Sequence, residues 1–326
     1  MSTLQTQQSS PPVTRSGSAP ENQQRSTPAQ LVDAINGAFG RHPHARALHA
    51  KGIVLDGTFT PSAAARTLSR APHLQCADVP VTVRFSNFNP TPGSPDLDPT
   101  HGPRGMALRF HLPDGSATDL VTHSYNGFPT STADEFRQLF LALGASGPGV
   151  PSPTPAAQFL ASHPAAKAFL EAPNPMPVSY GALRYFGVNS FKLTNAEGRA
   201  TFGRYRIEPA QGEHFLSSEE QGRAGADYLQ DEILARGAHG PISFTLCLQI
   251  AEEMDKLEDP SVAWPEIRAV VALGVITLTS VVADAEAADR ALLFSPGALP
   301  PGIEPADPMI LARSKAYLVS YERRQE

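Results

Sequence analysis

The chain has 326 residues, a formal net charge of -6 and a hydrophobic fraction of 41%. At roughly 100–200 residues per domain, this length allows one or two domains, and the composition is that of a globular protein. No basic stretch could follow a phosphate backbone, which argues against nucleic acid as a partner, and no apolar run is long enough to span a membrane. The 32 Pro and 25 Gly residues favour a turn-rich sheet protein over a helical bundle.

Residues 1–26 form a polar segment rich in Ser, Pro, Gln and Thr. Such a segment cannot bury enough apolar surface to offset its chain entropy, so we predict a disordered tail followed by a single domain over 27–326. The N-terminus lacks the apolar core of a secretory signal, which predicts a cytoplasmic protein. Cys76 and Cys247 follow no disulfide or metal-ligand spacing and are expected to be free thiols.

Helix starts are indicated by capping residues. Thr27 to Gln30 reads as a capping box and predicts a helix that ends at Gly40. Thr132 to Glu135 reads as a second capping box in front of an apolar stripe. Further helices are predicted at 155–171, 218–236 and 307–323.

Strands are indicated by alternation of apolar and polar residues. In 81–86 this period of two places Arg84 and Ser86 on one face, opposite the apolar residues. The segment 106–112 alternates in the same way. Further strands are predicted at 189–194, 201–207, 241–251 and 269–283. The sequence therefore predicts an α+β protein, with an antiparallel β-barrel or folded sheet and helices packed around it.

The C-terminal helix carries a candidate metal ligand. Arg313 and Tyr317 are four residues apart, which puts both side chains on one helix face. A guanidinium beside a phenol favours the phenolate, a hard anionic ligand suited to ferric iron. His49, Ser86 and Asn126 would add a base and two polar groups to orient the base and a substrate. Each of these residues taken alone also fits an ordinary structural role.

Six segments of the chain occur in the same order as in the haem catalases. They are RALHAKG, VRFS, GPRGMALRF, FKLTNAEG, DPSVAWP and PPGIEPADPMILARSKAY. The chain resembles that superfamily over about residues 40–324, and its length resembles the small catalase-related peroxidases rather than the full-length catalases. The resemblance implies an antiparallel β-barrel of the haem-catalase type with surrounding helices, and haem b as the iron-containing cofactor.

The resemblance implies roles for four residues of these segments and for Arg324, which lies seven residues beyond Tyr317. His49 matches the distal histidine of the R-x-x-H-A-K-G motif, and Ser86 matches the serine that hydrogen-bonds this histidine. Arg46, Arg84 and Arg324 match arginines that bind the haem propionates. Partly buried propionates need cationic partners of this kind.

The distal asparagine of the family has two candidate matches. Anchoring the comparison on Pro129 selects Asn126 and implies a three-residue insertion, whereas anchoring it on Asp119 selects His123. We expect Asn126, because an amide reproduces the neutral hydrogen-bond donor of the family.

The resemblance makes Tyr317 the axial iron ligand and Arg313 its partner. In the family a histidine links this arginine to an aspartate. Asp307 matches the aspartate, but the histidine position reads Asn189. Because a neutral amide carries no charge, the donation of the phenolate to the iron is expected to differ from that of the family.

The resemblance implies a peroxidase that reduces hydrogen peroxide and organic hydroperoxides with a small reducing substrate, and weak catalase activity at most. Only nine residues follow Tyr317, so we expect the long C-terminal segment of the large catalases to be missing and the route to the haem to be wider. The sequence leaves the oligomeric state open, with a homo-oligomer as one option. It also leaves open which peroxide and which electron donor are used.

Three alternatives are weighed against this function. A hydroperoxide-rearranging enzyme of the allene-oxide-synthase type would need no electron donor. A non-enzymatic haem-binding protein would need no distal base, so His49 with Ser86 argues against it. A barrel that has lost haem would leave four arginines converging without an anion: Arg46, Arg84, Arg313 and Arg324.

Overall fold

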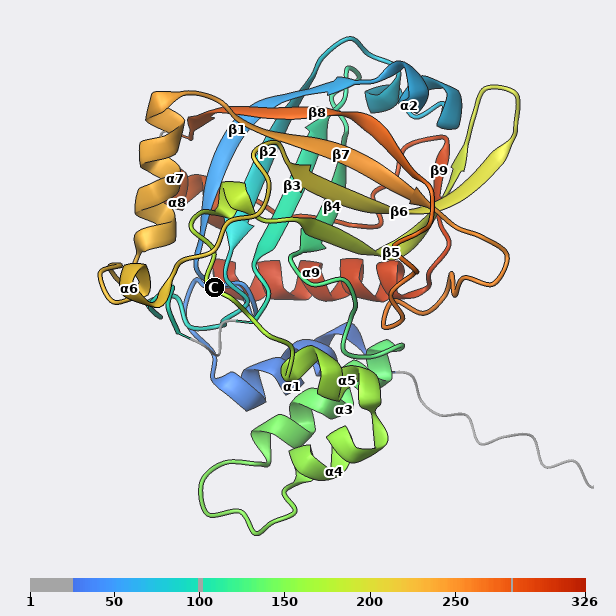
Figure 1. Cartoon of the computed structure of the whole chain (residues 1–326). Helices are drawn as coiled ribbons and strands as arrows, with labels where there is room; N and C mark the ends of the chain where they lie inside the picture. The colour runs from blue at the N-terminus through green and yellow to red at the C-terminus, as the bar shows by residue number, and fades with distance from the viewer. Residues whose placement is uncertain (1–25, 99–101, 283) are drawn as a thin grey trace, which may run out of the picture.

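The structure is a computed structural model, and it describes residues 26–98, 102–282 and 284–326 (Figure 1). Of the predicted tail, all but Ser26 lies outside the described residues. The backbone N–H of Ser26 donates to the Asp134 carboxylate at 2.6 Å. The first helix, α1 (Pro28–Phe39), starts behind the predicted capping box, in which Thr27 and Gln30 cap each other's backbone amides. Gly40 ends it with a φ of 85°.

An antiparallel β-barrel forms the body of the protein, as predicted (Figure 1). Eight strands close it in the order β4-β3-β2-β1-β8-β7-β6-β5, and the pairing of His123 with Phe186 joins β4 back to β5. A ninth strand, β9 (Ile303–Pro305), pairs antiparallel with β5 outside the barrel closure. The barrel strands are β1 (Gly52–Pro61), β2 (Val79–Ser86), β3 (Gly105–His111), β4 (Ala117–His123), β5 (Tyr185–Thr194), β6 (Ala200–Pro209), β7 (Ile242–Ile250) and β8 (Val270–Val281).

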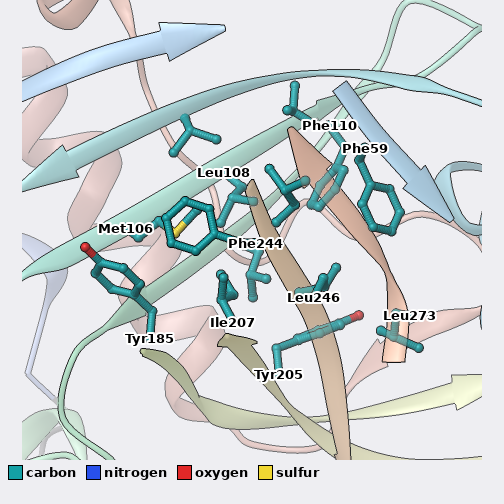
Figure 2. Close-up of a cluster of buried hydrophobic side chains, with 14 of the residues drawn as sticks. Phe59, Met106, Leu108, Phe110, Tyr185, Tyr205, Ile207, Phe244, Leu246 and Leu273 are labelled. Atoms are coloured by element: carbon teal, nitrogen blue, oxygen red, sulfur yellow. The ribbon is translucent and has the colours of Figure 1, made fainter. Parts of the chain in front are cut away.

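The barrel interior is a packed core rather than a channel. Aromatic and aliphatic side chains from facing strands meet there, and Phe59, Phe244 and Leu108 are fully buried (Figure 2). The alternation in β2 sends Phe85 inward to stack on Tyr180 at a ring distance of 5.4 Å. Its neighbours Arg84 and Ser86 therefore face outward, as the period of two predicts.

Helices cover the outside of the barrel. The C-terminal helix α9 (Met309–Gln325) runs between the barrel and a layer of helices beneath it (Figure 1). That layer comprises α1, which packs on α3 and α9, together with α3 (Ala133–Gly144), α4 (Pro155–Ser162) and α5 (Pro164–Leu170). The remaining α-helices of the described chain are α2 (Ala63–Leu68), α6 (Ser218–Gln221), α7 (Tyr228–His239) and α8 (Ala285–Ala291).

Three helix predictions need correction. The helix predicted at 155–171 is two helices, because Pro164 has no N–H to continue the first and instead begins the second. The helix predicted at 218–236 is also two, separated by a segment with two glycines, which disfavour helix. The second capping box is only half formed: Thr132 accepts from the Glu135 amide, but the Glu135 carboxylate accepts from Ser131 instead. Among the residues that the structure describes, no helix is long and apolar enough to cross a membrane.

Candidate functional site

A cavity lies between the outer face of strands β2–β4 and helices α1 and α9. Its empty volume is about 1260 Å³ counted out to its mouth, and most of the residues that line it are apolar. All but one of the predicted site residues line this cavity: Arg46, His49, Arg84, Ser86, Arg313, Tyr317 and Arg324. We call the side with His49 and Ser86 the distal wall and the side with Arg313 and Tyr317 the proximal wall.

On the distal wall, His49 is held in a strained backbone conformation. Its φ of 57° lies in the left-handed region, which few residues other than glycine adopt. The ring Nδ1 lies 3.0 Å from Ser86 Oγ, and Phe88 packs edge-on against the ring. Burial, and after it the positive charge of Arg84, lowers the pKa of His49 well below its usual value. His49 is therefore a neutral base at physiological pH.

Gly105 makes the approach of His49 and Ser86 possible, and sequence reasoning missed it. A Cβ at this position would lie 2.5 Å from Ser86 Oγ and 2.9 Å from His49 Nδ1. Only glycine leaves room for this hydrogen bond beneath the histidine ring. The signal was present in the sequence as the second glycine of GPRGMALRF.

A buried polar network fixes the backbone on either side of the His49–Ser86 pair. The Lys51 ammonium lies 2.8 Å from the Asp96 carboxylate, which also accepts from the Asn87 side chain at 2.7 Å. The Tyr180 hydroxyl donates to the Asn87 side-chain oxygen at 2.8 Å. Lys51 follows His49 by two residues and Asn87 follows Ser86 directly, so the network restrains both partners. Sequence reasoning did not identify these residues.

The structure does not bring Asn126 to the cavity. Its side-chain amide donates to the Glu266 carboxylate at 3.2 Å in an exposed contact. His123 lines the cavity instead, at the end of β4 and directly opposite Gly105 on β3. Its side chain is buried, and burial together with the charge of Arg313 lowers its pKa to about 3. The alignment anchored on Asp119 is therefore the one that leads into the cavity.

Three arginines gather at one end of the cavity around Asp289, which sequence reasoning missed. Arg46 and Arg84 each lie 2.5 Å from its carboxylate. Arg324 donates to the Leu292 carbonyl at 2.7 Å, and Arg46 donates to the same carbonyl at 2.8 Å. Burial, followed by Arg84, lowers the pKa of Arg46. Burial opposes ionisation of Asp289, but Arg84 and Arg46 outweigh it and lower its pKa.

The charges of this cluster do not balance. Three guanidiniums face one carboxylate, which leaves two positive charges in a partly buried site. In a haem-free barrel these arginines would therefore not lack an anion altogether, because the Asp289 carboxylate supplies one. Arg313 stands apart from the cluster, on the proximal wall.

The proximal wall is a continuous row of hydrogen bonds. Arg313 donates to the Tyr317 hydroxyl oxygen at 3.1 Å and to the side-chain oxygen of Asn189 at 2.6 Å. The Asn189 amide donates to Asp307 at 2.6 Å, and Asp307 also accepts from the Met309 amide at 2.8 Å. Burial raises the pKa of Asp307 against the effect of these bonds. Asn189 thus bridges Arg313 and Asp307, at the position that the sequence comparison gave it.

Comparisons with known proteins agree with this arrangement. The family model described as catalase matches residues 30–325. A protein named catalase-related peroxidase from Mycolicibacterium paratuberculosis is 38% identical over 91% of this chain and 95% of its own length. Another of that name, from Synechococcus elongatus, is 32% identical over 91% and 88%. A solved structure of a bacterial catalase shares the fold, with a TM-score of 0.74 at 20% identity over 95% of this chain and 64% of that one. From the extent of these matches we conclude that the chain belongs to the catalase family.

Proposed function

We propose that the protein is a haem-dependent peroxidase that reduces hydrogen peroxide and organic hydroperoxides with a small reducing substrate. One observation carries the proposal: a tyrosine oxygen backed by Arg313 and a neutral histidine held by Ser86 line the same largely apolar cavity. The relatives named catalase-related peroxidase support it. Peroxide and a reducing substrate are the partners that this function requires, and we place the protein in the cytoplasm.

The cavity fits haem b. Most of its wall is apolar, as a porphyrin requires, and the unbalanced double positive charge of the arginine cluster matches two propionates. Tyr317 would hold the iron, and Arg46, Arg84 and Arg324 would hold the propionates. When bound, the haem would supply the ferric centre whose redox chemistry cleaves the O–O bond of a peroxide.

His49 moves the proton in this reaction. In the tautomer in which Nδ1 donates to Ser86 Oγ, Nε2 carries no proton and can accept one from the peroxide. The same nitrogen then returns the proton to the departing oxygen, which leaves as water or alcohol. A positioned proton shuttle of this kind contributes ~10²–10⁴-fold to a rate. On the proximal wall, the Arg313 guanidinium donates to the Tyr317 oxygen and holds it in position.

A second hollow supports the use of organic hydroperoxides. It has an empty volume of about 830 Å³ and shares Phe88, Pro103 and Phe169 with the main cavity. Phe88 packs edge-on against His49 at a ring distance of 5.3 Å, so the hollow adjoins the distal wall. The organic substituent of a hydroperoxide could extend into this space while its peroxide group reaches His49.

The test compares three reactions on one haem-loaded preparation: oxygen release from hydrogen peroxide, oxidation of a small aromatic donor, and turnover of an organic hydroperoxide without a donor. We expect both peroxides to support oxidation of the donor, and we expect little release of oxygen from hydrogen peroxide. Oxygen release as the main reaction, with negligible donor oxidation, would make the protein a catalase. Donor-independent turnover of the organic hydroperoxide would make it a rearranging enzyme.

A further inference from the structure

His123 lies beside the proposed reaction centre. It is the last residue of β4 and pairs across the sheet with Gly105, the residue over which His49 and Ser86 meet. Its ring packs edge-on against Phe169 at 6.1 Å and at a tilt against Phe128 at 6.4 Å. Both neighbouring rings also line the cavity. His123 therefore belongs to the distal wall.

The two ring nitrogens of His123 have different surroundings. Nδ1 accepts from the backbone N–H of Tyr125 at 3.4 Å, and an amide N–H can only donate. Nδ1 is therefore the unprotonated nitrogen, and in the neutral ring the proton sits on Nε2. This Nε2 is buried and has no hydrogen-bond partner in the described part of the chain. A buried N–H without a partner is costly, which points to a ligand in the cavity as its acceptor.

The charges around His123 keep it neutral. Burial and the Arg313 guanidinium both act against a proton on Nδ1 and lower the pKa to about 3, and the hydrogen bond from the Tyr125 amide only partly opposes this. The other titratable ring nearby is His49, whose own pKa is lowered by burial first and by His123 among its neighbours. The distal wall thus holds two neutral imidazoles, and the ring of His123 has an open donor.

We propose that His123 is a fixed, neutral hydrogen-bond donor of the distal wall, whose Nε2–H donates a hydrogen bond to an oxygen of the bound peroxide. The proposal rests on the proposed function and adds a substrate-binding residue to it. It also corrects the reason for expecting Asn126. An amide is not the only neutral donor, because an imidazole with its Nδ1 engaged as an acceptor presents one too.

Fluoride binding to the ferric haem-loaded protein tests the donor without turnover. Fluoride accepts hydrogen bonds but cannot be reduced. We expect His123→Leu to weaken fluoride binding roughly tenfold, the size of one lost hydrogen bond, and His123→Gln to restore part of the loss. Asn126→Ala is the matched control and should leave the affinity unchanged. Wild-type fluoride affinity in a His123→Leu variant with full haem content would overturn the proposal.

A second measurement keeps the proposal independent of haem loading. The imidazole nitrogen shifts of the haem-free protein in nuclear magnetic resonance should show His123 as the neutral form protonated at Nε2 from about pH 5 to 8. A proton on Nδ1, or a positively charged ring in this range, would overturn the proposal. Failure of the wild-type protein to bind haem would instead contradict the proposed function, and the resonance measurement would still decide the state of His123.

Discussion

On the proximal wall, every polar group behind Tyr317 has a partner, in a row from Arg313 through Asn189 to Asp307. On the distal wall, His49 and His123 each use one ring nitrogen inside the protein, and the second nitrogen of His123 is left without a partner in the described chain. Both walls are built into one cavity and share its apolar surroundings.

This difference in hydrogen bonding fits the two roles. The proximal wall would hold a permanent iron ligand, and the distal wall would meet a substrate that binds and leaves. A permanent iron ligand benefits from partners that fix its position and charge, which is the usual role of outer-sphere hydrogen bonds at metal sites. A reacting molecule needs donors and acceptors that are free until it arrives. Changes on the proximal wall should therefore affect haem retention, and changes on the distal wall should affect rates.

Replacing the proximal ligand should have the largest effect. We expect Tyr317→Phe to lower haem affinity by more than the ~10–100-fold typical for loss of an outer-sphere partner, because phenylalanine has no atom that can bind iron. Haem titration followed by absorption measures this. Tyr321→Phe, one turn further along α9, is the control and should retain haem. Equal haem affinity in Tyr317→Phe and wild type would remove Tyr317 from the metal site.

Removing the distal base should spare haem and slow the reaction. We expect His49→Ala to react with hydrogen peroxide ~10²–10⁴-fold more slowly, at haem content close to that of wild type, because the proton shuttle is lost while the iron ligand remains. Stopped-flow mixing of the haem-loaded protein with peroxide gives the rate. A wild-type rate would assign the proton transfer to another group.

The pH dependence of that rate tests whether His49 is the neutral base of the distal wall. Burial and then Arg84, His123, Arg313 and Arg46 lower the pKa of His49 well below 6.5. A base with a lowered pKa stays unprotonated as the pH falls, so the rate should stay level as the pH passes 6.5, the ordinary pKa of histidine, and decline only at lower pH. A decline centred near pH 6.5 would show that His49 titrates like a solvated histidine.

A single methyl group at Gly105 should disturb the distal wall alone. In Gly105→Ala the new Cβ would press on both Ser86 Oγ and His49 Nδ1, so one of them must move. We expect the peroxide rate to fall on the order of tenfold with haem retained, since small misplacements of a catalytic group are costly. Gly225→Ala is the control, because a Cβ there meets nothing within 4 Å. Equal rates for the two variants would mean that the His49–Ser86 contact is dispensable.

Breaking the proximal row at its centre should have a modest effect on stability. Asn189→Leu leaves Arg313 and the buried Asp307 each without one partner. We expect the free energy of unfolding to fall by ~1–3 kcal/mol, the cost of buried polar groups left unsatisfied, as measured by denaturant titration. Asn189→His serves as a comparison that can restore both contacts. No loss of stability in Asn189→Leu would show that the row is not a structural unit.

Sequence patterns located the proximal wall better than the distal wall. The i, i+4 spacing in one helix was enough to bring Arg313 and Tyr317 together, and the period of two was enough to turn Arg84 and Ser86 outward. Such local rules do not depend on the rest of the fold. Asp289 could not be found in this way, because its partners Arg46 and Arg84 come from distant parts of the chain.

The choice of Asn126 over His123 has a specific cause. Strand β4 was not predicted, so its register against β3, which places His123 opposite Gly105, could not be used. The sequence did contain a signal: Asp114–Gly115 between 106–112 and the following residues is typical of a tight hairpin turn. With that hairpin recognised, the antiparallel ladder between the two strands would have favoured His123. Choosing by side-chain chemistry alone favoured the amide.

The spectrum of the ferric haem-loaded protein shows whether Tyr317 holds the iron while the distal histidines stay free. Resonance Raman and absorption spectra of wild type should show a five-coordinate, high-spin iron with bands of a tyrosinate ligand, unchanged in His49→Ala and His123→Leu. A low-spin, histidine-ligated spectrum that disappears in either histidine variant would contradict this account.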